Sequence, residues 1–478
     1  MIASPQPNSL PHAPAPQARA PRRARIVVIG AGFGGLAAAK TLGRADAEVI
    51  VIDRTNHHVF QPLLYQVATS VLSTGQIGTP IRGLLGHQRN TTVILGTVTG
   101  LELPAPVAGR GAVGGEPGGV GRVFVSTADR DSVPVAFDHL IIATGARHSY
   151  FAHPEFETFA PGLKSLADAV AIRNKVLAAF EQAEAEEDPK KHRDLLTFVL
   201  VGAGPTGVEM SGALAVLVRS TLRREFRRVD PTTARIVLVD MMPKVLGTFA
   251  EPLSAAAKAR LERLGVEVRL GKAVDTIDED GVVVGGERIT SKTVVWTAGV
   301  APSPAAKWLA EGGGTAIPTD KPGRVRVNGD CSVPGHCNIF VIGDTASLDQ
   351  DGKPLPGVAQ VAMQQGHYVG RLLRARLRGK PDPKPFRYFD KGNMAVVGKN
   401  FAILQSGKLR LSGFFAWLAW AAIHLQFLAQ ANLRVSVFLQ WVWTYATGRR
   451  GSRLIVTPYQ TPASPALAVR TAESGVKP

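Results

Sequence analysis

The chain has 478 residues, of which 45% are hydrophobic and 19% charged, a composition typical of a folded rather than a disordered protein. This length exceeds what one hydrophobic core supports and suits two domains with an additional segment. The formal net charge of +17 favours anionic partners, but the chain carries no zinc-ligand spacing and no nucleic-acid-binding motif, so no nucleic acid is expected as a partner.

Both ends of the chain are predicted to be disordered tails, residues 1–23 and residues 461–478. The first is rich in proline and alanine and cannot form a packed core. No apolar segment of a secretory signal follows the initiator methionine. The arginines that accumulate before residue 26 leave a targeting role open as an alternative.

Order is expected to begin at Arg25 with a buried strand, followed by a glycine loop and a helix to about Leu42. The loop carries the G-x-G-x-x-G pattern in Gly30, Gly32 and Gly35. The first glycine permits the turn, the second lets the backbone approach a pyrophosphate, and the third lets helix and strand pack closely. Asp53 ends the next apolar run, where it can accept hydrogen bonds from a ribose diol. Together these features predict a dinucleotide site, assigned to FAD.

The same arrangement recurs in Gly202, Gly204 and Gly207, and the apolar run after its helix ends at Asp240. An acid at this position repels a 2′-phosphate and accepts a hydrogen bond from a 2′-hydroxyl, so the second site should prefer NADH to NADPH. Two dinucleotide sites in one chain imply hydride transfer between two redox cofactors.

Three further strand ends add residues to these predicted sites. Thr144 and Gly145 follow one strand of the first unit, and Gly299 follows the corresponding strand of the second. A later strand leads into Gly343 and Asp344. The expected fold class is therefore α/β, with two Rossmann-like dinucleotide-binding domains and a C-terminal amphipathic helical segment that anchors the protein to a membrane. The predicted ranges are an FAD-binding domain over 24–160 and 323–385, an NADH-binding domain over 161–322, and a membrane-associated region over 386–460.

Four motifs are more specific than the glycine loops, which many two-nucleotide flavoproteins share. They are the stretches 60–68 (FQPLLYQVA), 204–209 (GPTGVE), 359–366 (AQVAMQQG) and 390–392 (DKG). With them the chain resembles the type II NADH dehydrogenases, which are single-subunit NADH:quinone oxidoreductases. The resemblance extends from about Arg25 to about Ile455.

The resemblance implies roles for individual residues. Gln61, Pro62, Leu63 and Leu64 would lie beside the isoalloxazine, and Gly343 with Asp344 would bind the FAD ribitol and phosphates. Glu209 would reach the flavin and nicotinamide region, Lys391 would approach the flavin and pair with a carboxylate, and Gln360 and Gln364 would line the quinone pocket. Structural alternatives stay open, because a carboxylate near a helix start is stabilised by the dipole and Lys391 could be a surface lysine. Phe60 and Tyr65 are interpreted as packing residues.

Several other features are interpreted as unrelated to catalysis. The adjacent His57 and His58 on an extended segment point to opposite faces, so no metal site is expected there. Cys331 and Cys337 match neither a redox pair nor a zinc set and are taken as ordinary thiols. The glycine-rich insertion from Pro104 to Gly121 lengthens a hairpin without adding chemistry.

Residues 411–431 contain no charged side chain, and arginines occur on either side of the C-terminal region. Gln426, Gln430 and Arg434 recur at four-residue spacing and predict a polar stripe on one helical face. Together with the tryptophans of 435–445, this favours a helix pair lying in the interface of an acidic lipid surface. A single transmembrane helix at 411–431 and a buried hairpin or dimer contact are the alternatives. The resemblance also implies monotopic attachment and a homodimer. The expected location is the cytoplasmic face of the inner membrane.

The predicted activity is NADH oxidation through FAD with reduction of a membrane quinone and no proton pumping. A sulfide:quinone reductase is one alternative, and it requires redox cysteines beside the flavin. A NADH-sensing membrane scaffold without turnover is the alternative from another class.

Overall fold

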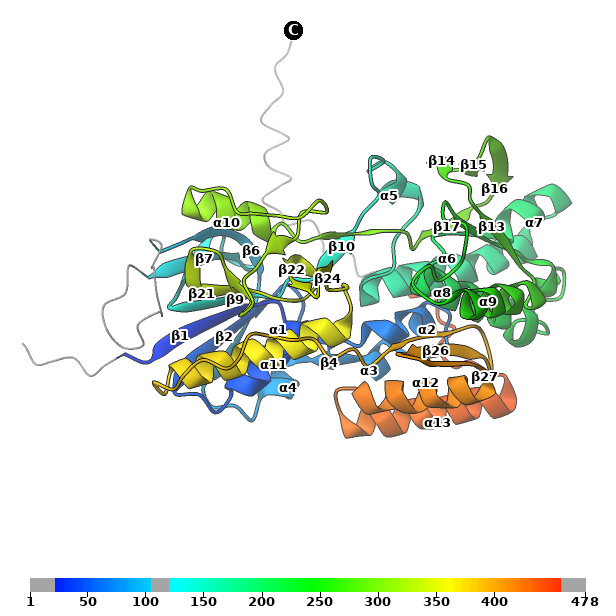
Figure 1. Cartoon of the computed structure of the whole chain (residues 1–478). Helices are drawn as coiled ribbons and strands as arrows, with labels where there is room; N and C mark the ends of the chain where they lie inside the picture. The colour runs from blue at the N-terminus through cyan, green and yellow to red at the C-terminus, as the bar shows by residue number, and fades with distance from the viewer. Residues whose placement is uncertain (1–21, 105–119, 457–478) are drawn as a thin grey trace, which may run out of the picture. The chain divides into compact units, whose positions relative to one another are not determined.

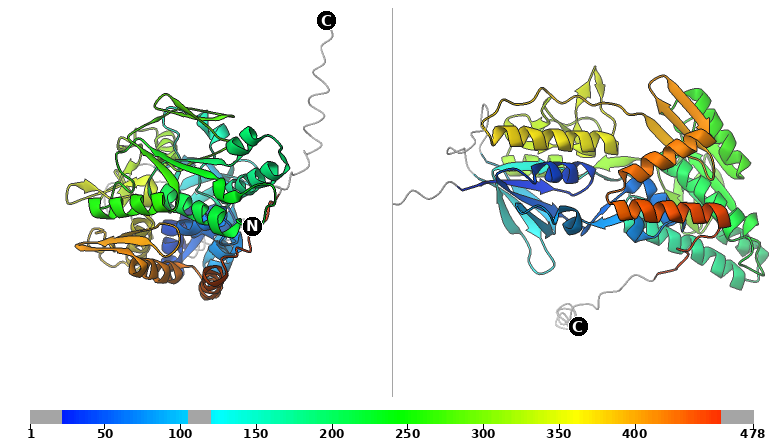
Figure 2. Two further views of the ribbon diagram at one scale, coloured as in Figure 1. Left: turned by 90° about the vertical axis from the view of Figure 1, so that its right-hand side faces the viewer. Right: turned by 90° about the horizontal axis from the view of Figure 1, so that it is seen from below.

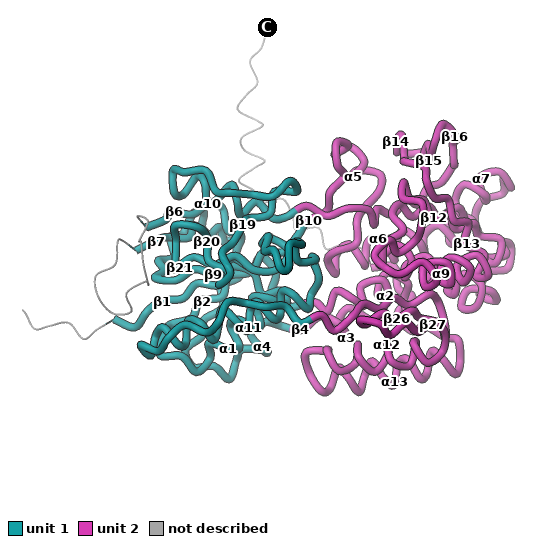
Figure 3. Tube along the Cα trace, in the orientation of Figure 1, with its two compact units in different colours: residues 1–58, 80–146, 302–389 teal, residues 59–79, 147–301, 390–478 magenta. Residues whose placement is uncertain are grey.

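The computed structural model describes residues 22–104 and 120–456 (Figure 1, with two further views in Figure 2). The predicted tails and the 104–121 insertion lie almost entirely outside these residues. The chain forms two compact units, shown in Figure 3: residues 1–58, 80–146 and 302–389, and residues 59–79, 147–301 and 390–478. The chain passes from one unit to the other within four short strands: β3 (His57–Val59), β4 (Gly78–Pro80), β10 (Ala146–His148) and β18 (Val300–Pro302).

The first unit is built on a six-stranded sheet whose central strands contain continuous apolar runs. Ile26 to Val28 are completely buried, because both faces of this sheet are covered, as is usual for parallel sheets. The strand order is β20 (Ser332–Val333), β21 (His336–Val341), β9 (His139–Ile142), β1 (Ala24–Ile29), β2 (Ala47–Asp53) and β5 (Thr91–Leu95), with only β20 antiparallel to its neighbour.

Helices cover one face of this sheet and a smaller sheet and a helix cover the other. On the first face, α1 (Phe33–Leu42) and α11 (Ala359–Arg376) lie side by side, blue and yellow in Figure 1, and α4 (Ile81–Leu85) packs into the same core. Gly366 permits the close approach of α1 and α11, since a Cβ there would lie 2.2 Å from Gly34 O. The opposite face carries α10 (Ala305–Gly313) and the antiparallel strands β6 (Thr97–Glu102), β7 (Gly121–Ser126) and β8 (Val133–Phe137).

Four further short strands and a turn complete the first unit. They are β19 (Val325–Arg326) paired with β22 (Ala346–Ser347), β23 (Asp349–Gln350) paired with β24 (Lys353–Pro354), and the 3-10 turn η4 (Gly343–Thr345).

The second unit repeats the parallel arrangement with four strands. Their order is β13 (Val266–Leu270), β12 (Arg235–Asp240), β11 (Thr197–Val201) and β17 (Thr293–Trp296). One face packs against the antiparallel strands β14 (Val274–Asp278), β15 (Gly281–Val284) and β16 (Glu287–Thr290). Phe180 of α6 (Leu166–Ala185) stacks on Phe198 of β11, with ring centroids 5.6 Å apart. The further helices and turns are α5 (Phe156–Phe159), α7 (Pro189–Leu195), α8 (Pro205–Val216), the π-helical turn η2 (Leu217–Thr221), η3 (Pro231–Thr233) and α9 (Glu251–Arg263).

Two segments, one before and one after residues 147–301, complete the second unit. The early one contains η1 (Gln61–Leu63), α2 (Leu64–Ala68) and α3 (Thr74–Ile77). The late one contains β25 (Asn393–Val396), β26 (Ala402–Ser406), β27 (Leu409–Gly413), α12 (Phe414–Phe427) and α13 (Ala431–Thr447).

The C-terminal helices correct two expectations. Residues 411–413 belong to a strand and the helix that follows ends at Phe427, so the predicted polar stripe is not on one helix: Gln430 caps the start of α13. The reason is local, since Leu428 and Gln430 have extended backbone between the two helices, so α13 starts anew at Ala431. Within the described ranges, no helix combines the length and apolarity that crossing a bilayer requires.

Candidate functional site

The first glycine loop follows β1 and has the construction that its sequence predicts. Gly30 has φ +93°, and a Cβ there would lie 2.5 Å from Ala143 O. Gly35 permits α1 to pack on the strand, because its Cβ would lie 1.7 Å from Gly30 O. Nothing lies within 4 Å of the Cβ position of Gly32, so the loop presents open space there at a helix N-terminus. The arrangement suits a pyrophosphate.

Asp53 anchors this loop from the end of β2. Its Oδ2 accepts a hydrogen bond from Ala31 N at 2.6 Å, and its Oδ1 accepts from Thr55 N and Thr55 Oγ1, both at 2.8 Å. Sequence reasoning assigned Asp53 to a ribose diol, and its fixing of the loop itself was not foreseen. A carboxylate has about four lone-pair sites, so capacity for a ribose hydroxyl remains.

Parallel strands bring the other predicted FAD residues of this unit to one sheet edge. Ile29, Ile142 and Val341 are register partners or neighbours, so the segments after β1, β9 and β21 emerge together. Thr345 Oγ1 donates to Gly145 O at 2.9 Å, and Thr144 Oγ1 lies 2.5 Å from Ser303 Oγ.

Gly343 begins the last of these segments with φ +73°. Its N–H donates to Gln365 Oε1 at 2.7 Å, which ties the strand end to α11. Asp344 follows, half-buried, in η4. Sequence reasoning assigned Gln365 no role of its own, and its place in the 359–366 motif was the available signal.

Gln360 and Gln364 lie one helical turn apart on α11 and therefore share a face. Both ends of the Gln364 amide hold the backbone of Phe389: Nε2 donates to Phe389 O at 2.9 Å, and Phe389 N donates to Oε1 at 3.0 Å. The quinone role of the two glutamines stays a prediction.

The second glycine loop, after β11, repeats the first in detail. Gly202 has φ +108°, the Cβ of Gly207 would lie 1.8 Å from Gly202 O, and the Cβ position of Gly204 is open. Asp240 accepts from Ala203 N through Oδ2 and from Met242 N at 2.8 Å through Oδ1. The two loops therefore have the same construction and follow strands of two different sheets. Each is held by the aspartate at the end of the neighbouring strand, Asp53 of β2 or Asp240 of β12.

Gly299 follows β17 with φ +76°, and its Cβ would lie 2.6 Å from the Phe151 ring. The neighbouring Thr297 Oγ1 lies 2.8 Å from both Val201 O and Gly202 O, so this strand end supports the second glycine loop.

Glu209 projects from the second turn of α8 toward β25. Its Oε1 accepts a hydrogen bond from Val396 N at 3.3 Å. Desolvation raises the pKa of Glu209 to about 8 from an ordinary value of 4.5, more than that hydrogen bond lowers it. The carboxyl is therefore largely protonated at neutral pH and can donate as well as accept a hydrogen bond.

This raised pKa predicts a pH-dependent stability. Between about pH 4.5 and 8 the folded state binds the proton more tightly than the unfolded state, so the free energy of unfolding should fall as pH rises through this window. In Glu209→Gln the amide does not titrate, so this part of the fall should disappear. Thermal unfolding of both proteins between pH 5 and 8.5 measures it. Parallel curves for the two proteins would contradict the raised pKa.

Lys391 lies in the exposed segment before β25. Its Nζ lies 5.6 Å from the centroid of the Phe427 ring. The structure places this ammonium over the Phe427 ring of α12, and the carboxylate partner that the motif suggests stays a prediction. The flavin role of Lys391 stays a prediction.

Gln61 to Leu64 form η1 and the start of α2. Gln61 is exposed and its Nε2 donates to Lys164 O at 3.4 Å, and Pro62 occupies the first turn. Leu63 and Leu64 are buried in the second unit, so both contribute to its core. The role of these four residues beside the isoalloxazine stays a prediction.

A hydrogen-bonded chain that sequence reasoning missed follows this segment. Trp441 Nε1 of α13 donates to Gln66 Oε1 at 2.7 Å, and Gln66 Nε2 donates to Tyr65 Oη at 3.0 Å. Burial raises the pKa of the Tyr65 hydroxyl, and the nearby Glu209 raises it further. Tyr65 is therefore more than the packing residue that the sequence suggested, and only its place in the 60–68 motif hinted at this.

The cysteines and histidines were interpreted as unrelated to catalysis. Cys331 is fully buried, and burial raises the pKa of its thiol, which disfavours the reactive thiolate. His58 is buried with Nδ1 3.0 Å from Ala31 O, whereas His57 Nδ1 lies 2.8 Å from Asn56 Oδ1. Across residues 22–104 and 120–456, no three metal-ligating side chains gather.

Comparisons with known proteins extend over nearly the whole chain. Residues 24–366 match the family model "Pyridine nucleotide-disulphide oxidoreductase". The chain is 44% identical over 452 residues to the type II NADH:quinone oxidoreductase Ndh of Mycobacterium tuberculosis, covering 93% of each chain. It is 41% identical to NdhA of the same organism, covering 93% of this chain and 94% of NdhA.

Among solved structures, NDH2 of Plasmodium falciparum in complex with NADH has a similar fold. Its TM-score is 0.77 at 18% identity, and the match covers 91% of this chain and 100% of that one. At this identity the likeness concerns the fold alone.

Proposed function

We infer the function from the premise that the chain belongs to the pyridine nucleotide-disulphide oxidoreductase family and, within it, to the type II NADH:quinone oxidoreductases. It is a flavoprotein enzyme that oxidises NADH and reduces a quinone. The observation that carries this conclusion is the pair of anchored glycine loops in two sheets, together with 44% identity over 93% of the chain. One loop without the other would provide for a single dinucleotide.

The residues of the first unit fit FAD. The open position at Gly32 would accommodate the pyrophosphate at the N-terminus of α1, Asp53 would face the ribose, and Gly343 with Asp344 would hold the ribitol end. When bound, the flavin supplies the capacity to accept a hydride and to pass on two electrons. Gly32 and Gly35 make the approach of the backbone possible, so the contribution of this loop is position rather than acid–base chemistry.

The second unit would bind NADH at Gly202, Gly204 and Gly207, with Asp240 disfavouring a 2′-phosphate. Glu209 and Gly299 lie on the helix and the strand end that flank this loop. We assign Glu209 to positioning or to proton transfer, because its pKa of about 8 lets it exchange a proton near neutral pH.

We also propose that the protein attaches to a membrane surface through α12 and α13. Many of their large apolar side chains are exposed, far beyond what single scattered residues explain. Arginines in the chain around them would contact acidic lipid. The exposed set is Phe414, Phe415, Leu418, Ile423, Phe427, Val435, Phe438, Leu439, Val442, Trp443 and Tyr445. Monotopic attachment on the cytoplasmic face of the inner membrane, a homodimer and turnover without proton pumping complete the proposal.

Anaerobic stopped-flow absorbance tests the reaction in two steps. NADH should bleach the oxidised-flavin spectrum rapidly and NADPH at least about tenfold more slowly, since an acid facing a 2′-phosphate costs about 1.4 kcal/mol or more. A short-chain quinone should then restore the spectrum. Bleaching without recovery would mean a different electron acceptor, and equal rates for the two nucleotides would contradict the role of Asp240.

The two rivals make different predictions in the same assay. In a sulfide:quinone reductase, sulfide would bleach the flavin spectrum, and the double variant Cys331→Ser with Cys337→Ser would lose activity. A NADH-sensing scaffold would show no steady NADH:quinone turnover.

A further inference from the structure

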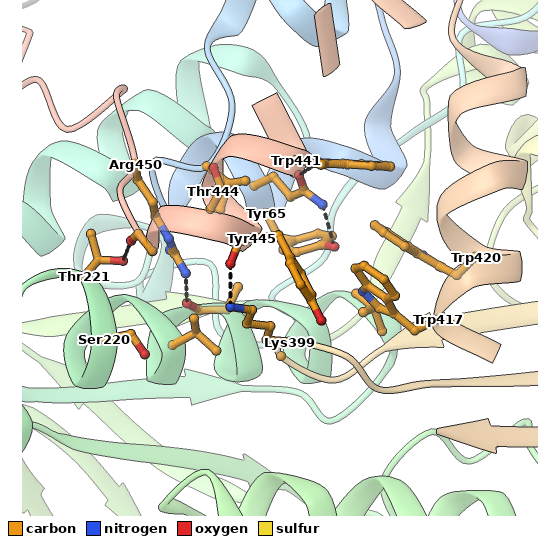
Figure 4. A pocket seen from close by; sticks show the side chains of 17 residues that line it. Tyr65, Ser220, Thr221, Lys399, Trp417, Trp420, Trp441, Thr444, Tyr445 and Arg450 are labelled. Carbon is orange, nitrogen blue, oxygen red and sulfur yellow. Dashed lines mark hydrogen bonds between the residues drawn. The ribbon is translucent and has the colours of Figure 1, made fainter. Parts of the chain in front are cut away.

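The second unit contains a cavity of about 130 Å³ that the proposed reaction does not use (Figure 4). Helices α2, α8, α12 and α13 and the strand β25 contribute to its wall. Five aromatic side chains line it: Tyr65, Trp417, Trp420, Trp441 and Tyr445. An apolar cavity of about this size can hold a benzene-sized group.

One arginine gives this apolar cavity a charged end. Arg450 is 3% exposed; its Nη1 donates to Thr69 O at 2.6 Å and its Nη2 to Ala213 O at 3.2 Å. The Nε is buried and has no partner among the described residues, and no acidic side chain there lies within 4 Å of the guanidinium. A buried cation without a counter-ion is costly.

Residues that line the cavity carry positive charge and buried donors without partners. Besides Arg450 Nε, the indole Nε1 of Trp420 is buried without a partner in the described part of the chain. Lys399 also lines the cavity, with its Nζ 4.5 Å from the centroid of the Tyr445 ring, and no acidic residue lines it. The missing partner is therefore an acceptor, and the charge balance favours an anion over a neutral molecule.

Figure 4 shows how these groups are arranged. Arg450 lies at one end of the pocket beside Thr221, whereas Trp417 and Trp420 lie at the other end, with Tyr445 between them. The cavity is thus amphipathic along its length. Burial lowers the pKa of Arg450, and the Arg453 guanidinium lowers it further, as expected of a charge that lacks a counter-ion.

We propose that this cavity binds an amphiphile with one anionic head and one alkyl chain, such as a fatty acid, with the carboxylate paired with the Arg450 guanidinium and the first carbons of the chain against Trp417 and Trp420. The cavity is partly open, so the rest of a longer chain would extend out of it. The site adds a ligand to the proposed function, and the binding measurement below does not depend on turnover. Binding would supply the counter-ion and fill apolar volume at the same time. A single buried arginine suits a monoanion better than a dianionic phosphate.

The tryptophans provide a direct test. The flavin-loaded protein in neutral detergent is titrated with decanoate that carries a bromine on its chain, which quenches indole fluorescence on contact. We expect saturable quenching by the brominated acid and displacement by plain decanoate. Decanol and decyltrimethylammonium should displace it at least about tenfold less well, since a charged hydrogen bond contributes on the order of 1.5–3 kcal/mol. Equal displacement by decanol would overturn the anionic site.

Neighbouring arginines supply a matched pair of variants. Arg450→Gln should weaken decanoate binding by about tenfold or more, whereas Arg449→Gln, at an exposed position outside the cavity, should leave it unchanged. Should Arg450→Gln lose its fold, Val216→Phe fills the same cavity from α8 and should also abolish quenching while Arg450 stays in place. Wild-type affinity in both cavity variants would overturn the proposal.

Competition experiments distinguish a fatty acid from other ligands that could occupy the cavity. Displacement of the brominated acid by a short-chain quinone at its KM would identify the cavity as part of the quinone site and overturn a separate ligand. Displacement by diacyl phosphatidylglycerol but not by decanoate would assign the site to a phospholipid headgroup instead and would also overturn the fatty-acid assignment.

Discussion

Gly35→Ala is expected to yield a protein without bound FAD and without NADH:quinone activity. An added Cβ would lie 1.7 Å from the backbone oxygen of Gly30, so α1 must move away from β1 and its N-terminus away from the pyrophosphate. Overlap of this kind costs on the order of 1–3 kcal/mol or more, which weakens FAD binding by about ten- to a hundredfold or more. The absorbance ratio of flavin to protein after purification measures it.

Gly207 provides a matched variant in the other sheet. Its Cβ would lie 1.8 Å from Gly202 O, so Gly207→Ala should disturb the second loop as strongly. This protein should keep its FAD and lose rapid bleaching by NADH. Gly83→Ala, in α4 of the first unit, meets nothing nearer than 3.9 Å and should retain both properties. Loss of FAD in Gly207→Ala but not in Gly35→Ala would reverse the assignment of the two loops.

Placing a carboxylate on each C-terminal helix is expected to release the protein from lipid vesicles. Phe415 is 78% exposed on α12 and Trp443 56% exposed on α13. Phe415→Glu with Trp443→Glu removes two aromatic anchors, each worth on the order of 1.5–3 kcal/mol when buried in lipid, and adds two charges that repel acidic headgroups. Together these should lower vesicle affinity by more than about a hundredfold. Cosedimentation with phosphatidylglycerol vesicles measures the affinity.

The control variant carries the same change in charge at two positions outside the C-terminal helices. Leu95 and Phe389 are 52% and 69% exposed in the first unit, so Leu95→Glu with Phe389→Glu adds the same two charges at positions that belong to neither α12 nor α13. It should sediment with vesicles almost as the unaltered protein does. If both double variants lost vesicle binding equally, net charge rather than the helix pair would account for attachment.

Both glycine loops could be predicted because each is encoded locally. The strand, the turn, the helix start and the terminal acid lie within about 20 to 40 residues of one another, and only glycine satisfies the close approaches at Gly30, Gly35, Gly202 and Gly207. The buried parallel strands could also be predicted from the sequence, because a strand that is covered on both faces contains a continuous apolar run.

Side-chain partners far apart in the chain could not be predicted in the same way. No spacing rule joins Trp441 to Gln66, which are 375 residues apart, or Arg450 to the carbonyl oxygens of Thr69 and Ala213. Lys391 illustrates the same limit, because its motif suggests a carboxylate partner and the fold provides the Phe427 ring.

The sequence by itself therefore determined the two nucleotide-binding loops, the α/β class and the presence of an apolar C-terminal segment. Only the tertiary structure decided that this segment is two short helices, that Asp53 and Asp240 fix their own loops, and that Arg450 lies at one end of an aromatic cavity. The physical reason is that backbone turns and buried strands depend on neighbours in the chain, whereas the partner of a buried polar side chain depends on which distant segments pack around it.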